Sequence, residues 1–186
     1  MSFKSAKAWE AWLAKQPSDS SGVWLKFAKK SAGVASVTKA EAIAGALCFG
    51  WIDGQLAPFD AHWFLTRFTP RKARSKWSEI NRATALRMIE EGRMRPHGHA
   101  EIERAKADGR WAAAYAGQRT IEVPPDLARA LRARPKAKAF FETLESVNRY
   151  AVLYRIHDAK KPETRASRIA KFVDMLSRGE RIHSKD

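Results

Sequence analysis

The sequence predicts an α+β protein, with a small antiparallel sheet of about three strands in its N-terminal half packed against helices, and an all-helical C-terminal half. Before residue 70, short runs alternate apolar and polar residues with the period of two that strands show; after Pro70 the apolar spacing is helical to the end. Between two of the extended runs lies the turn-rich segment APFDA (57–61). We expect one domain over residues 1–186, with an α/β part at about 1–70 and a helical part at about 71–186.

The first elements follow from this spacing. Residues 4–16 carry Trp9, Trp12 and Leu13 at helical spacing and are followed by the helix-breaking Pro17. In GVWLKFAKK (22–30) every second residue is apolar, which predicts a strand with one buried face.

A second helix is predicted from Thr38 to near Gly50. Thr38 and Glu41 have the spacing of a capping box, in which each side chain satisfies the backbone N–H of the other residue. The extended runs 51–56 and 62–69, on either side of APFDA, then predict a hairpin.

The remainder should form five or six helices, with breaks at 92–96, 109, 123–125, 135 and 162. The longest is expected from Pro162 or Glu163 to Ser177, since proline suits a first helical turn and Gly179 suits a C-terminal cap.

Composition limits the function without fixing it. Lys and Arg number 35 against 20 Asp and Glu, a net charge of +15, which favours anionic partners such as an anionic small molecule, an acidic protein or nucleic acid bound without sequence preference. No apolar stretch reaches the roughly 20 residues of a membrane-spanning helix, and Cys48 has no second cysteine with which to pair. We therefore expect a cytoplasmic protein, and the sequence leaves its oligomeric state open.

The densest cationic segment follows the hairpin. It holds five basic residues within ten positions, without a carboxylate and beside Phe68 and Trp77: Arg67, Arg71, Lys72, Arg74 and Lys76. Guanidinium groups beside aromatic rings suit a flat or phosphorylated anion. The alternative is a solvated basic loop with both aromatic residues in the core.

For other polar residues, too, a purely structural role is the alternative to a functional one. Asp53 follows an apolar run and needs a cation such as Arg67 or Arg71 if it is buried, or else it caps a turn. Cys48 is expected to be a buried, inert thiol. His97 and His99 lack further nearby metal ligands, so we expect no metal and no cofactor.

Four segments together resemble the YdeI/OmpD-associated family, also called bacteriocin-protection proteins: ALCFGWIDG (46–54), FTPRKARSKWSEIN (68–81), EGRM (91–94) and KKPETRASRI (160–169). The chain departs from that family's pattern at Ala73, where proline is usual, and near His97. The resemblance implies an indirect role in tolerance of bacteriocins or cationic antimicrobial peptides, with no established biochemical activity.

These observations support three hypotheses. The first is a non-enzymatic protein that binds an anionic ligand or partner in a cleft between the sheet and the following helices, lined by Trp51, Asp53, Arg67, Arg71, Lys72, Trp77 and Asn81. The second is a small-molecule enzyme with Asp53 as acid or base and an arginine that clamps the anion. The third is a protein that binds nucleic acid non-specifically through its basic surface.

Overall fold

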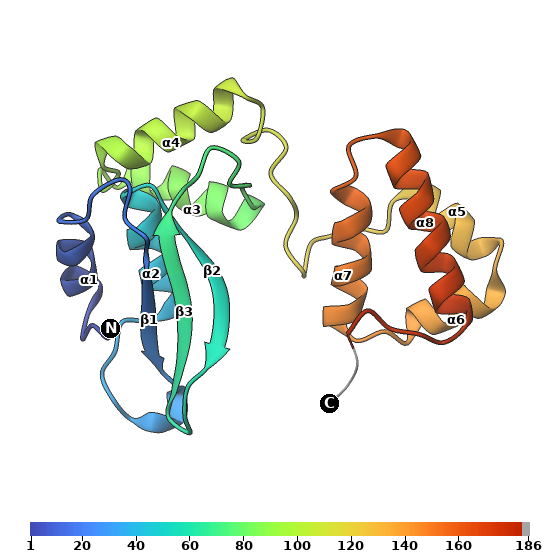
Figure 1. Ribbon diagram of the computed structural model, residues 1–186, viewed down its shortest axis with the longest axis horizontal. Coiled ribbons are helices and arrows are strands. Elements are labelled where there is room, and N and C mark those ends of the chain that lie inside the picture. Colours follow the sequence, from blue (N-terminus) through green and yellow to red (C-terminus); the bar gives the residue numbers. More distant parts are fainter. Residues whose placement is uncertain (184–186) are drawn as a thin grey trace. The chain divides into compact units, whose positions relative to one another are not determined.

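The computed structural model describes residues 1–183 and confirms the α+β class, with a three-stranded antiparallel sheet in the N-terminal half and a helical C-terminal half (Figure 1). The elements are, in chain order, α1 (Ala6–Leu13), β1 (Val23–Ala28), the 3-10 helix η1 (Lys30–Ala32), α2 (Lys39–Cys48), β2 (Trp51–Pro58), β3 (Trp63–Pro70), α3 (Glu79–Glu90), α4 (Pro96–Ala107), α5 (Pro125–Arg132), α6 (Pro135–Glu142), α7 (Ser146–His157) and α8 (Pro162–Ser177).

The chain divides into two compact units, residues 1–114 and residues 115–186. The first unit holds the sheet and helices α1 to α4, and the second holds α5 to α8. The expected change of structure near residue 70 therefore falls inside the first unit, because α3 and α4 belong with the sheet. That residues 1–186 form one domain stays a prediction.

The sheet has the order β1-β3-β2, with both pairs antiparallel, so the predicted hairpin is confirmed. Along β1, Val23, Leu25 and Phe27 are buried and alternate with partly exposed residues, as the period-two pattern predicts. Helices cover the face to which these three side chains point, and α2 lies behind the strands in Figure 1. The opposite face is called the outer sheet face below.

Helix α2 is the central element of the first unit. The capping box is present, with the Glu41 amide donating to the Thr38 hydroxyl and the Thr38 amide donating to the Glu41 carboxylate at 2.8 Å. One hydrophobic cluster joins α2 to the sheet and α1, and another joins it to α3 and α4. This sandwiched position explains why Ala42 and Ala46 are buried besides the single apolar face that helical spacing predicts.

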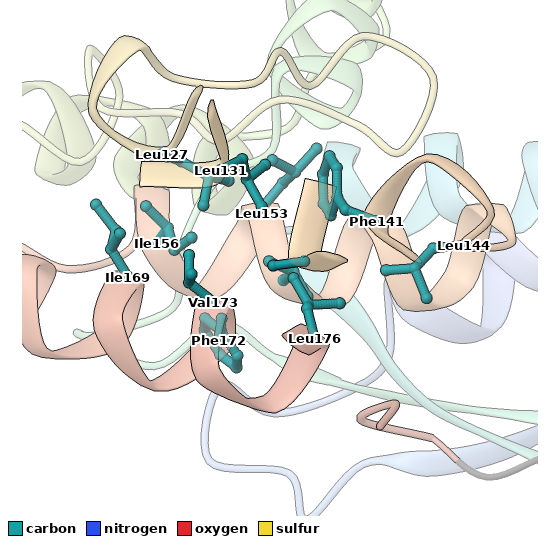
Figure 2. Packing of buried hydrophobic residues seen from close by; sticks show 12 residues of the cluster. Leu127, Leu131, Phe141, Leu144, Leu153, Ile156, Ile169, Phe172, Val173 and Leu176 are labelled. Atoms are coloured by element: carbon teal, nitrogen blue, oxygen red, sulfur yellow. The ribbon is translucent and has the colours of Figure 1, made fainter. Parts of the chain in front are cut away.

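The second unit has its own core, shown in Figure 2. Helix α8 begins at Pro162 and ends at Ser177, as predicted, and buries Ile169, Phe172, Val173 and Leu176 against side chains of the other three helices. These four apolar residues recur at helical spacing and so form one face of α8. Burial of this face supplies the hydrophobic free energy that holds α8 in place.

An ion pair connects α5 and α8, the first and last helices of this unit. Arg165 Nε donates to Asp126 Oδ2 at 2.5 Å, and its Nη2 donates to Oδ1 at 3.0 Å. The same guanidinium also donates to the carbonyl of Ile156 at 2.9 Å, so Arg165 connects α5, α7 and α8.

Candidate functional site

A pocket of about 550 Å³ opens in the first unit and is called the α1–α4 pocket here. Its wall is formed by α1 and the residues after it, the α2–β2 turn, the end of β3 and the first turns of α4: Lys7, Glu10, Ala11, Leu13, Ala14, Gln16, Pro17, Ser18, Phe49, Gly50, Trp51, Pro70, Arg71, Arg95, Pro96, His97 and Glu101. Its volume falls within the range of small-molecule sites.

The sheet positions two predicted site residues in this pocket. Trp51 begins β2 and pairs with Pro70 at the end of β3, so the next residue, Arg71, comes beside it. The Arg71 amide donates to the Gly50 carbonyl at 2.9 Å, which continues the pairing beyond the strand. Both side chains are buried, at 3% and 5% exposure, which makes this a well-ordered corner of the pocket.

Arg71 is oriented by an aromatic ring and a backbone carbonyl. Its guanidinium carbon lies 3.6 Å from the centroid of the Trp77 ring, and Nη1 donates to the Lys76 carbonyl at 3.2 Å. A cation–π contact with an indole, together with this hydrogen bond, restrains the position of the guanidinium. Trp77 itself is buried against Trp111, with ring centroids 4.8 Å apart, so it serves as a fixed support.

The N-terminus of α4 contributes further positive potential. Pro96 occupies the first turn, and no side chain caps this end of the helix. Uncapped amides at a helix N-terminus carry partial positive charge and favour anions. Lys7 and Arg95 add two full charges to the same pocket wall.

The two carboxylates of the pocket have arginine partners that lie outside its lining. Glu10 accepts from Arg93 at 2.7 Å, and Glu101 Oε1 lies 2.9 Å from Arg104. Because these partners neutralise Glu10 and Glu101, the pocket's net potential is set by its own cations. Glu101 Oε2 is buried and, within residues 1–183, accepts no hydrogen bond.

The remaining predicted site residues lie elsewhere in the first unit. Asp53 lies 3.9 Å from the cation of Lys39 in α2, in place of the arginine expected across the hairpin. Arg67 is on the outer sheet face and donates to the Ser21 carbonyl at 2.7 Å. Lys72 is exposed in the loop after β3. Asn81 lies in the first turn of α3, where its backbone amide donates to the Ser78 hydroxyl.

Several residues of the pocket were not predicted, because α1 and α4 are brought to the hairpin only by tertiary packing. The feature of the sequence that bears on this packing is a pair of glycines, Gly50 and Gly98, which allow α4 to lie close to α2 and the α2–β2 turn. Gly50 has a φ of 74°, and a Cβ added to it would lie 3.0 Å from the His97 carbonyl oxygen. Nothing in local spacing indicates what these glycines contact.

The thiol of Cys48 fits the predicted inert role. It is 1% exposed, and burial raises its pKa to about 11, so the reactive thiolate is disfavoured at neutral pH. No group of three or more His, Cys, Asp or Glu side chains in residues 1–183 is arranged to hold a metal ion.

The family comparisons divide the chain much as its compact units do. Residues 1–101 match a family described as a domain of unknown function (DUF8412), and residues 120–179 match the family described as bacteriocin-protection, YdeI or OmpD-associated. No curated protein and no solved structure shows a significant match. None of the helices within residues 1–183 has the length and apolar character to cross a membrane.

The YdeI/OmpD-associated resemblance is thus confirmed for residues 120–179, which include the segment KKPETRASRI. The other three segments lie within residues 1–101, which match the DUF8412 family. Residues 120–179 are similar to the bacteriocin-protection, YdeI or OmpD-associated family, and the chain belongs, through more than half of its length, to the DUF8412 family.

Proposed function

We propose that the protein is a non-enzymatic binding protein that holds a small anionic molecule in the α1–α4 pocket. The observation that carries this proposal is the buried guanidinium of Arg71, which lines the pocket with Trp51 and lies over the ring of Trp77. A buried guanidinium in the pocket wall supplies a fixed positive charge that favours a carboxylate or a phosphate.

The pocket's other groups narrow the ligand class. Lys7 and Arg95 complement a second negative charge, while Phe49 and Trp51 supply apolar surface. Small carboxylates and phosphates with an apolar portion have this combination.

The proposal includes a cellular role. The family description of residues 120–179 links this chain type to bacteriocin protection. We propose that ligand binding in the cytoplasm contributes to tolerance of bacteriocins or cationic antimicrobial peptides indirectly, through a response that depends on the bound state.

The test is a thermal-shift screen of the full chain against small carboxylates, phosphates and amino acids, followed by calorimetric titration of each hit. A ligand that binds only the native state raises the unfolding midpoint as its concentration rises. Arg95→Ala should weaken a hit by about tenfold, as expected for removal of a hydrogen bond to a charged group.

Lys72→Ala is the matched control, because it removes one exposed positive charge outside the pocket. If Lys72→Ala weakens binding as much as Arg95→Ala does, the contact is diffuse and the pocket is not the site. If no small anion stabilises the wild-type chain at millimolar concentration, the proposal is wrong.

A further inference from the structure

The outer sheet face is aromatic and cationic. Cross-strand pairing places Trp24 opposite Arg67, Lys26 opposite Leu65 and Ala28 opposite Trp63, so these six side chains share one face. They alternate with Val23, Leu25 and Phe27, which point into the core. Two indole rings, one from each strand, therefore flank two cations on a single surface.

No core element of the first unit covers this face. Trp24, Trp63 and Leu65 are partly exposed and belong to none of the hydrophobic clusters within residues 1–183. Phe59 of the hairpin turn is 55% exposed beside them. In a chain whose other large aromatic side chains are mostly packed into cores, these rings need a different explanation.

Aromatic rings, and for Arg67 also the Ser21 carbonyl, hold the two cations in place of carboxylates. Lys26 Nζ lies 4.1 Å from the centroid of Phe59 and 4.8 Å from that of Trp63, and the Arg67 guanidinium carbon lies 5.8 Å from the Trp24 ring. In residues 1–183 neither cation has a carboxylate within ion-pair distance. Their charge is therefore available to an anion that approaches the face.

The acidic side chain at the hairpin tip is already engaged. Asp60 accepts the backbone amides of His62 and Trp63, each at 2.8 Å. This carboxylate stabilises the turn and also interacts coulombically with Lys26. Two cations against one carboxylate leave the face with a net positive charge, in keeping with the chain's net +15.

We propose that the outer sheet face binds single-stranded nucleic acid. Exposed rings on a sheet provide platforms on which unpaired bases stack, and interspersed cations meet the phosphates. Base pairs in a duplex hide the faces that would stack, so single strands are preferred. This site is separate from the α1–α4 pocket and takes a polymer where the pocket takes a small molecule.

The test measures fluorescence anisotropy of a labelled oligothymidylate of about twelve nucleotides with the full chain at several salt concentrations, which suits the site sizes of such surfaces. Trp24→Thr/Trp63→Thr should weaken binding by about tenfold or more, since removing each stacking partner is worth that order. Threonine keeps strand propensity, and circular dichroism checks the fold. Trp24→Phe/Trp63→Phe, which retains two rings, should preserve most of the affinity.

The charge variants separate this face from the general basic surface. Lys26→Ala/Arg67→Ala should make the negative slope of log affinity against log salt concentration shallower by about 1.4, which is about 0.7 for each phosphate that is no longer neutralised. Lys136→Ala/Lys138→Ala removes the same charge from exposed positions of α6 and should leave binding near the wild-type value.

Polyphosphate, a polyanion without bases, is the second probe. Its binding should fall in Lys26→Ala/Arg67→Ala and remain unchanged in Trp24→Thr/Trp63→Thr. The proposal is overturned if the threonine variant binds oligothymidylate as the wild type does, if it loses both probes equally, or if the α6 variant is as impaired as Lys26→Ala/Arg67→Ala. Binding to phosphatidylglycerol vesicles without binding to the oligonucleotide would identify a lipid surface instead and would also overturn it.

Discussion

Replacing Gly98 with alanine should destabilise the protein although alanine is the better helix former. Gly98 lies in α4, where it faces the C-terminal end of α2. A Cβ at this position would lie 2.4 Å from the Cys48 carbonyl oxygen, 2.4 Å from Met94 Sδ and 2.8 Å from the Leu47 carbonyl oxygen. The methionine side chain can move, but the two carbonyls can retreat only if a helix shifts.

The expected loss in the free energy of unfolding is the difference between the cost of overpacking and the gain in helix propensity. Alanine in place of glycine gains about 1 kcal/mol of helix propensity. Overpacking against a rigid backbone costs about 3 kcal/mol, the upper part of its usual range. A shift of α4 would also strain the hydrogen bond from the Arg95 amide to the same Cys48 carbonyl, now 3.0 Å long. The net loss is about 2 kcal/mol, or about 4–8 °C in the unfolding midpoint for a chain of this size.

Thermal and urea unfolding, followed by circular dichroism, measure this loss. Ala100→Gly, at an exposed position of the same helix, calibrates the propensity term and should cost about 1 kcal/mol. If Gly98→Ala is as stable as the wild type or more stable, the close approach of α4 to α2 is refuted, and with it the position of the α4 wall of the pocket.

Two further predictions concern ionisable groups. Hydrogen bonds from Arg165 lower the pKa of the Asp126 carboxyl, so the stability from this pair is present above about pH 4, the ordinary value, and is lost as the pH falls through the folded pKa. Asp126→Asn should therefore cost about 1 kcal/mol at pH 7, given the pair's partial exposure, and less in acid; urea unfolding from pH 7 to pH 2 measures this, and a constant difference contradicts it. Because burial raises the pKa of Cys48 to about 11, iodoacetamide should label the native thiol far more slowly than the urea-unfolded thiol at pH 8, as read by mass spectrometry. Equal rates would show that the thiol is accessible.

Local patterns were sufficient where the controlling interactions are local. The capping box at Thr38 and Glu41 involves residues three apart, and the limits of α8 follow from Pro162 and the apolar stripe up to Leu176. The hairpin was predictable for the same reason, since its strands are joined by a short turn.

The candidate site was predicted only in part. The segment after β3 indicated that Arg71 and Trp77 belong together, and the structure brings them into contact. The sequence did not show which of Arg67 and Arg71 lines the pocket. In the structure, Arg67 lies on the outer sheet face, whereas Arg71 lies beyond the end of β3 and lines the α1–α4 pocket. The sequence also did not associate Lys7 or Glu101 with Trp51, since these positions lie far apart in the chain.

The sequence by itself determined the α+β class, the strand and helix periodicities, the basic character and the resemblance of residues 160–169, because propensity, spacing and charge act between near neighbours. Only the tertiary structure decided that α1 and α4 enclose the pocket beside Arg71, and that the indoles of Trp24 and Trp63 share an uncovered face. Those arrangements depend on which surfaces are buried against each other, and burial is a property of the whole packed unit.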